Sequence, residues 1–358
     1  MYTINLESPE QFFVYRFLQT AMGTLIFIFL FVALVDPNNT LPLSLPLERI
    51  PVTNNQRFGY TSIARDTNFD SLIIGTSTTR MIKPDDINNI FNTKFSNLSL
   101  DSGTWWEQGQ MFQLFLRHHP NPKMVLWGID TVWCSPQGLG SRLTPRPFPS
   151  WLYDDNPWNN YLYILNFKHI ELAGRQIGNV MGIKGVQRFG RDGYASLNRK
   201  GVPYDLAKAR YNIYGQTTPI PPVKLLKRAA FPLHYLRHKP YPKLQKLQLL
   251  LSMLPATTRI VLVMVPYHQH YLGSENAARM LKYQECKRRV FKISKTRQYG
   301  YYIDFMFRSN FTSEDSNYWD IMHYNEKGAK IIQNALIDLI VHDKHTSDIY
   351  RSKALRDD

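Results

Sequence analysis

The stretch SLIIGTSTTR, residues 71–80, joins a short apolar run to a glycine and a cluster of small hydroxyl side chains. Four further apolar runs follow, at residues 95–100, 124–129, 260–265 and 301–305. They are continuous rather than alternating, which is typical of strands in a parallel sheet that is covered on both faces. The sequence therefore predicts a sheet of about five buried parallel strands.

Helical patterns lie between these runs. The segment TWWEQGQMFQLFLRHH begins with the capping-box spacing of Thr104 and Glu107, and two further helices are expected from about Glu275 and Asn325. Alternation of strands and helices predicts an α/β domain with a doubly wound sheet. In such sheets a ligand binds beyond the carboxyl ends of the strands, which is where the Gly-Thr-Ser cluster falls.

The amino-terminal part of the chain predicts a membrane anchor. Residues 17–35 carry no charge and approach the ~20 residues that cross a hydrocarbon core of ~30 Å. Arg16 precedes this run and the next basic residue is Arg49, which favours residues 1–16 in the cytoplasm and the remainder outside it, at the periplasm or cell surface. An uncleaved signal anchor is expected, and a cleaved signal peptide is the alternative.

The chain after this helix divides by composition. Residues 36–60 are rich in Pro and Asn and predict an extended linker. The domain is expected over residues 61–345, followed by a tail at 346–358. Within it, residues 134–245 break the alternation with prolines, paired aromatics and basic residues such as Arg188. This stretch is interpreted as a large insertion that forms a lid or wall over the strand ends.

The charge balance points to an anionic partner. The formal net charge is +15, which suits an acidic polymer or a membrane surface, although a solvated basic face is the ordinary alternative. The chain has no zinc-finger spacing and no Gly-rich phosphate loop, so nucleic acid is not favoured as a partner, and no metal or cofactor is expected. The two cysteines, Cys134 and Cys286, are too far apart for a C-x-x-C motif, and whether they pair is left open.

A serine becomes a nucleophile when a base takes its proton and a carboxylate orients that base. Among the ten histidines, only His323 has an aspartate three residues before it, Asp320. This D-x-x-H segment follows the fifth apolar run and precedes the last helix, so it too is expected at the carboxyl edge of the sheet. Together with Ser77 after the first run, it predicts a Ser-His-Asp site.

With these motifs, residues 68–132 and 258–343 resemble the SGNH (GDSL-like) hydrolase and acyltransferase superfamily. The closer likeness is to membrane-anchored members that handle acyl groups on cell-envelope polymers, such as the teichoic-acid D-alanylation and alginate O-acetylation proteins. The resemblance implies Ser77 in IIGTSTTR as nucleophile, and His323 and Asp320 in DIMH as base and orienter.

The resemblance also implies an oxyanion hole, for which Gly103 in NLSLDSG offers its backbone N–H. The family often adds an asparagine side chain, but LWGIDTVW has Asp130 there, and an ionised carboxylate cannot donate a hydrogen bond. Asn97 is then a candidate donor, or the hole relies on backbone N–H groups such as that of Ser77. Substrate contacts are expected from three side chains near the same edge: Asp130, Arg80 and His268.

Each residue also has an ordinary structural alternative. The hydroxyls of the GTSTT segment can cap a helix, Gly103 can shape a turn, and Asp130 can cap a turn or helix. His323 can be a structural histidine at a helix start whose ring nitrogens are hydrogen-bonded. His268 and His270 can bind a metal or lie on plain surface.

The sequence thus predicts O-acyl transfer to or from a cell-envelope glycan through an acyl-enzyme on Ser77. The expected partners are an acyl donor, an envelope polysaccharide or anionic polymer, and a membrane-bound protein that delivers the acyl group. Two alternatives remain: an esterase or deacetylase with the same triad, and a non-catalytic, membrane-tethered glycan-binding or assembly protein. The fold alone does not separate them.

Overall fold

The computed structural model describes residues 8–183, 188–197, 203–220, 233–273 and 278–353, so the predicted segments 1–16 and 346–358 lie partly outside it. The described residues form a five-stranded sheet in the order β2-β1-β3-β4-β5, with every neighbouring pair parallel. The predicted α/β fold with five parallel strands is confirmed. The strands are β1 (Ser71–Ile74), β2 (Phe95–Asn97), β3 (Met124–Ile129), β4 (Arg259–Met264) and β5 (Gly300–Asp304).

Helices cover the sheet in two groups. α3 (Asp85–Phe91) contacts α13 (Glu326–Ile340). α4 (Trp105–His118) contacts α9 (Pro242–Ser252), which in turn contacts α11 (Ala278–Lys295). The strands between them are buried along almost their whole length, which explains why their sequences are continuous apolar runs.

The predicted capping box at the start of α4 is confirmed. The Thr104 hydroxyl accepts a hydrogen bond from the Glu107 N–H at 3.1 Å, and the Glu107 carboxylate accepts one from the Thr104 N–H at 3.0 Å. Both donors belong to the first turn of a helix, where no intrahelical acceptor exists. The cap therefore fixes where the chain turns from the β2 edge into the helix layer.

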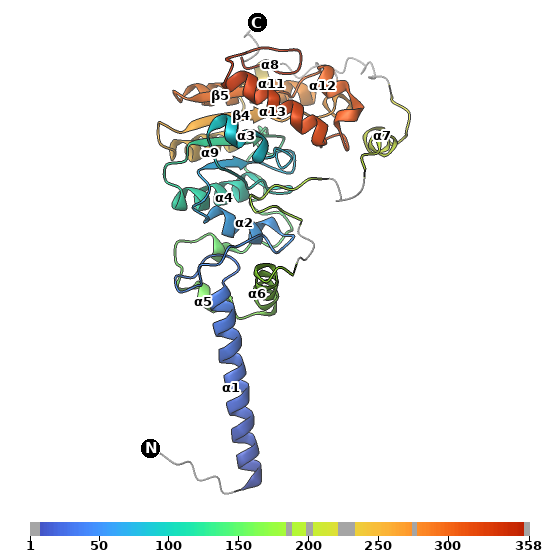
Figure 1. The fold of residues 1–358 in the computed structure, drawn as a ribbon. Coiled ribbons are helices and arrows are strands. Elements are labelled where there is room, and N and C mark those ends of the chain that lie inside the picture. The colour runs from blue at the N-terminus through green and yellow to red at the C-terminus, as the bar shows by residue number, and fades with distance from the viewer. Residues whose placement is uncertain (1–7, 184–187, 198–202, 221–232, 274–277, 354–358) are drawn as a thin grey trace.

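An apolar helix, α1 (Pro9–Val35), projects from this domain (Figure 1). It is long and apolar enough to cross a membrane. Its final turns are part of the domain, because Val32 and Val35 are buried against Ile164 and Ala173. The helix is therefore anchored in a small apolar core of its own, separate from the core around the sheet.

Residues 36–60 differ from the predicted extended linker. The Asp36 side chain is buried and accepts a hydrogen bond from the Leu41 N–H at 2.7 Å, while Arg49 Nε donates to the Asp36 carbonyl at 2.7 Å. The segment ends in α2 (Gln56–Ala64), which contacts α4. Turns lie at residues 37–38 and 42–43, and the contacts of Asp36 tie the segment to the end of α1, so α1 continues into the domain without a flexible joint.

The insertion between β3 and α9 contributes helices to two separate parts of the domain. α5 (Asn160–Tyr163) and α6 (Phe167–Val180) lie beside the end of α1, and α7 (Leu206–Tyr214) lies far from it (Figure 1). α7 instead contacts η2 (Asp315–Asn317), close to the strand ends. Short elements complete the described chain: η1 (Ser150–Leu152), α8 (Leu233–Arg237), α10 (Gln269–Leu272) and α12 (Asn310–Ser313).

Cys134 and Cys286 form a disulfide, which answers the question that the sequence left open. Both are fully buried, and the bond joins the loop after β3 to α11 across 152 residues of chain. The disulfide thus closes a covalent loop that contains the insertion. A disulfide of this kind is typical of proteins that fold in an oxidising compartment.

We expect the double substitution Cys134→Ala/Cys286→Ala to lower stability by about 2–4 kcal/mol, because a crosslink over a long loop restricts the unfolded chain. This corresponds to a fall in Tm of roughly 5–10 °C for a domain of this size. Thermal unfolding of the full chain in detergent, with and without reductant, measures it. Equal Tm values for the wild type and the variant under oxidising conditions would contradict the prediction.

Candidate active site

The turn after β1 carries the nucleophile candidate. Gly75 follows the strand, and a Cβ atom at Gly75 or at Gly128 of β3 would overlap the Thr79 side chain. The two glycines therefore allow Thr79 to pack between the strand ends, and the Thr79 N–H donates to the Thr76 carbonyl at 3.0 Å. The chain makes a turn here, and α3 begins only at Asp85, so the hydroxyls do not cap a helix.

His323 lies within hydrogen-bond distance of both Ser77 and Asp320. Ser77 Oγ is 2.8 Å from His323 Nε2, and His323 Nδ1 is 2.9 Å from Asp320 Oδ2. With the proton on Nδ1 donated to Asp320, Nε2 is free to accept the hydroxyl proton of Ser77. His323 and Asp320 are partly exposed, so the three side chains meet at an accessible edge of the sheet.

Backbone groups hold the Asp320 carboxylate in place. Asp320 Oδ1 accepts hydrogen bonds from the N–H of Met322 at 2.8 Å and of His323 at 2.9 Å. Partial burial acts to raise the pKa of Asp320, but the hydrogen bond and charge of His323 and the two backbone donors outweigh it, so the pKa lies below its usual value. Asp320 is therefore ionised at neutral pH, as an orienting carboxylate must be.

A second network, not found from the sequence, fixes the loop that carries Asp320 and His323. Asp315 Oδ1 accepts from Tyr214 Oη at 2.6 Å, and its Oδ2 accepts from Arg210 Nε at 2.8 Å. Both donors belong to α7 of the insertion. The Tyr204 hydroxyl adds hydrogen bonds to the carbonyls of Asp315 and Tyr318. The insertion thus braces this loop through the hydrogen bonds of its described residues.

His268 belongs to this second network, which corrects its predicted contact with substrate. Its side chain is fully buried, and its Nε2 lies 3.2 Å from Asp315 Oδ1. Burial lowers the pKa of His268 to about 4, although Asp315 acts against this, so the ring is neutral at neutral pH. No group of three or more possible metal ligands occurs among the described residues, His270 included.

Two of the three predicted oxyanion donors are already engaged. The Gly103 N–H donates to the Leu100 carbonyl at 2.9 Å, closing a turn in which a Cβ would lie 2.7 Å from Leu100 Cβ. Asn97 Nδ2 is buried and points to the carbonyls of Thr79, Arg80 and Ile82. In the part of the chain that is described, neither is free to meet an oxyanion, which corrects both predictions.

Ser77 itself remains as a donor. No hydrogen bond involves its backbone N–H among the described residues, whereas its hydroxyl is held by His323. An N–H on the nucleophile is well placed to meet the oxygen of a carbonyl that the same residue attacks. An oxyanion site built on this turn therefore has fewer hydrogen-bond donors than the sequence predicted.

Asp130 is buried at the end of β3 and does not face solvent as a substrate-binding side chain. Its carboxyl group forms hydrogen bonds with the Thr76 hydroxyl and, at 2.9 Å, with the Val132 N–H. It therefore caps the turn after β3 and supports Thr76, the residue before Ser77. Burial raises the pKa of Asp130 even though Thr76 and Val132 oppose this shift.

Arg80 is also buried, which corrects its predicted role in binding substrate. It forms an ion pair with Asp101, on the turn that Leu100 and Gly103 close. The other carboxylate oxygen of Asp101 lies 3.3 Å from Arg188 and 3.8 Å from Arg146. Both of these arginines are about half exposed, so the exposed positive charge beside this turn comes from the insertion.

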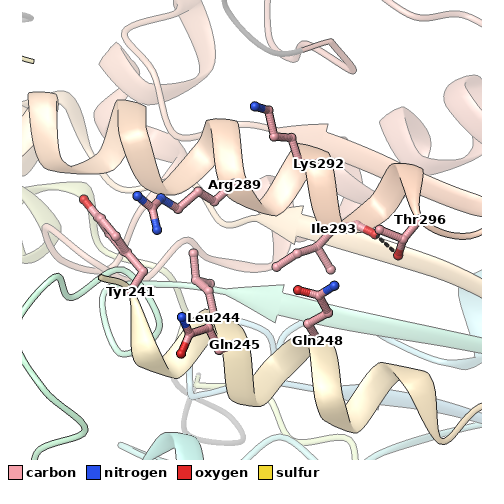
Figure 2. Close-up of a pocket in the computed structure, with 8 residues that line it drawn as sticks. All are labelled: Tyr241, Leu244, Gln245, Gln248, Arg289, Lys292, Ile293 and Thr296. Atoms are coloured by element: carbon pink, nitrogen blue, oxygen red, sulfur yellow. Dashed lines mark hydrogen bonds between the residues drawn. The ribbon is translucent and has the colours of Figure 1, made fainter. Parts of the chain in front are cut away.

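A separate hollow of about 210 Å³ lies between α9 and α11, and Figure 2 shows its lining, with Tyr241, Leu244 and Gln248 on one side and Arg289 and Ile293 on the other. It includes no member of the Ser77 site. Arg289 is held by Glu285 and by the carbonyls of Arg237 and Lys239. The hollow is a gap between packed helices and lies apart from the Ser77–His323–Asp320 cluster.

No family model matches the sequence, and no curated protein matches it.

We expect Asp130→Asn to stabilise the protein increasingly as the pH rises from about 4. The unfolded carboxyl ionises near pH 3.9, while the folded one keeps its proton to higher pH, so the wild type loses stability between the two pKa values. Asparagine has no proton to lose and can pair with the same neighbours. Thermal unfolding at pH 4 and pH 7 measures the difference in Tm between the variant and the wild type, with Asp348→Asn at the surface as the matched control. A difference that stays constant or shrinks as the pH rises would contradict the prediction for Asp130.

Proposed function

We propose that the chain performs serine-dependent acyl-ester chemistry in an SGNH-like domain, with Ser77 as nucleophile, His323 as base and Asp320 as orienter. The observation that carries this proposal is the 2.8 Å contact between Ser77 Oγ and His323 Nε2, with Asp320 2.9 Å from the other ring nitrogen. The order along the chain, with serine after β1 and the Asp-x-x-His turn before α13, also fits that superfamily.

In the proposed mechanism, Ser77 Oγ attacks the carbonyl carbon of an acyl ester while its proton passes to His323 Nε2. The negative charge that forms on the carbonyl oxygen faces the Ser77 N–H. The intermediate collapses, and the departing alcohol takes the proton from His323, which leaves the acyl group on Ser77. An acceptor hydroxyl then loses its proton to His323 as it attacks this ester, and Ser77 recovers the proton when the acyl group leaves.

Two observations support a membrane-anchored domain outside the cytoplasm. The last turns of α1 are buried against Ile164 and Ala173, so cleavage after Val35 would uncover apolar surface that the domain keeps buried. This favours an uncleaved anchor over a cleaved signal peptide. The disulfide favours a periplasmic or cell-surface compartment.

The acceptor we favour is an envelope polysaccharide or anionic polymer. Arg146 and Arg188 place positive charge beside the turn at residues 100–103, which pairs with the nucleophile turn through Leu100 and Gly75. The net charge of +15 favours the same class of partner. A membrane-bound protein would deliver the acyl donor. If water replaces the acceptor, the same site acts as an esterase or deacetylase.

A non-catalytic role is the second candidate, and the engaged state of Gly103 and Asn97 favours it. Loss of one oxyanion donor typically costs about 10²–10³ in rate. A domain with few donors fits a membrane-tethered glycan-binding or assembly protein as well as it fits a slow enzyme.

We expect the full chain in detergent to react covalently with a fluorophosphonate, and Ser77→Ala and His323→Ala to abolish the labelling. Asp320→Asn should slow it by orders of magnitude, because the imidazole then loses its orienting carboxylate. Ser252→Ala and His342→Ala, both at exposed positions, are the matched controls and should label like the wild type.

Labelling is read by gel fluorescence, and circular dichroism checks that each variant is folded. A folded wild type that does not label, or that labels equally in Ser77→Ala, would contradict the proposal and favour the non-catalytic role.

A further inference from the structure

The part of α1 that lies outside the domain is shorter than the hydrocarbon core of a membrane. The uncharged residues 17–35 span about 28 Å at 1.5 Å per residue, close to the ~30 Å of a hydrocarbon core. The domain, however, packs against the last turns, from Ile28 to Val35. The segment Phe17–Phe27 below the domain spans only about 16 Å. Lengthening it towards the amino terminus brings Arg16 into the hydrocarbon, which is costly.

The same last turns also keep an apolar side uncovered. Leu30 and Leu34 are exposed, although Val32 and Val35 of those turns are buried. An apolar helix surface that the domain leaves open at this level suits contact with lipid chains. The end of α1 therefore fits the membrane on one side and the domain on the other.

The part of the domain at this level presents exposed apolar and aromatic side chains. Tyr161 lies 6.2 Å from the Phe29 ring of α1, and the Trp158 ring stacks on Tyr161 at 6.1 Å. Around them, Leu162 is 82% exposed and Phe167 is 92% exposed. We call the exposed set the interfacial patch: Trp158, Leu162, Tyr163, Leu165 and Phe167.

We propose that the interfacial patch docks into the outer interface of the bilayer that α1 crosses, and so holds the domain against the membrane; this inference rests on the proposed anchoring by α1. Lipid is the occupant we favour because α5, which carries part of the patch, lies beside the end of the apolar helix α1 (Figure 1), where Tyr161 contacts Phe29. Trp and Tyr are also enriched where a protein meets the interface, since their rings are apolar and their tips polar.

Docking at this patch gives the domain a fixed height and tilt. α1 enters the domain without a flexible joint, because Arg49 and Asp36 tie the chain that follows it. Two contacts with one bilayer, the helix and the patch, then leave the domain little freedom to swing. The Ser77 site is thereby held at a constant distance from the membrane surface.

The test uses the full chain in vesicles of phosphatidylcholine and phosphatidylglycerol, with one cysteine introduced for an environment-sensitive fluorophore. The two native cysteines are paired, so only the new thiol reacts. Leu162→Cys and Phe167→Cys report on the patch. Leu249→Cys, exposed on α9, is the matched control, and Met22→Cys reports on α1. Each label is challenged with nitroxide-bearing lipids and, separately, with aqueous iodide.

We expect labels at 162 and 167 to be quenched by the nitroxide lipids, with iodide quenching several-fold weaker than at 249. If the label at 22 is quenched by lipid while those at 162 and 167 behave like 249, the docking inference is wrong although the anchor stands. If the label at 22 also escapes lipid, the anchor itself fails. Protection of 162 and 167 from both quenchers would mean that protein covers the patch, and would overturn the inference.

Discussion

The hydrogen bond between Ser77 and His323 joins residues 246 positions apart in the chain, and the parallel sheet makes that meeting possible. Parallel strands place all their carboxyl ends at one edge, so the turn after β1 and the loop after β5 emerge on the same side. β1 also lies where the strand order changes direction, with β2 on one side and β3 on the other. Ser77 therefore stands at the position where such sheets ordinarily bind ligands.

The histidine side of this contact needs support that the sheet does not provide. His323 lies in an irregular loop, and a base in a loose loop meets its nucleophile only part of the time. Asp315 supplies the support by taking hydrogen bonds from Tyr214 and Arg210 of α7. Burial acts to raise the pKa of Asp315, but these two donors outweigh it and lower the pKa, so the carboxylate stays ionised and the brace is charge-assisted. The insertion thus acts on the site through this loop.

The sequence was sufficient for features that depend on local pattern. Continuous apolar runs predicted the strands, and the Thr104–Glu107 spacing predicted a helix start. The D-x-x-H motif identified His323 as the candidate base. The sequence was insufficient where a side chain has several possible partners. Asn97 has the right chemistry for an oxyanion donor, yet three carbonyls of the turn after β1 surround its amide. Arg80 and His268 were misassigned for the same reason, because their carboxylate partners come from distant turns that no periodicity reveals.

The central claim is that Ser77 carries an acyl group during turnover, and trapping that ester tests it most directly. The full chain is incubated with an activated acetyl ester, quenched in acid and measured by intact-mass and peptide mass spectrometry. The account predicts one acetyl group per chain, on the peptide that contains Ser77, and none on that peptide in Ser77→Ala. Acetylation that is confined to lysines, or that is the same in both proteins, would contradict it.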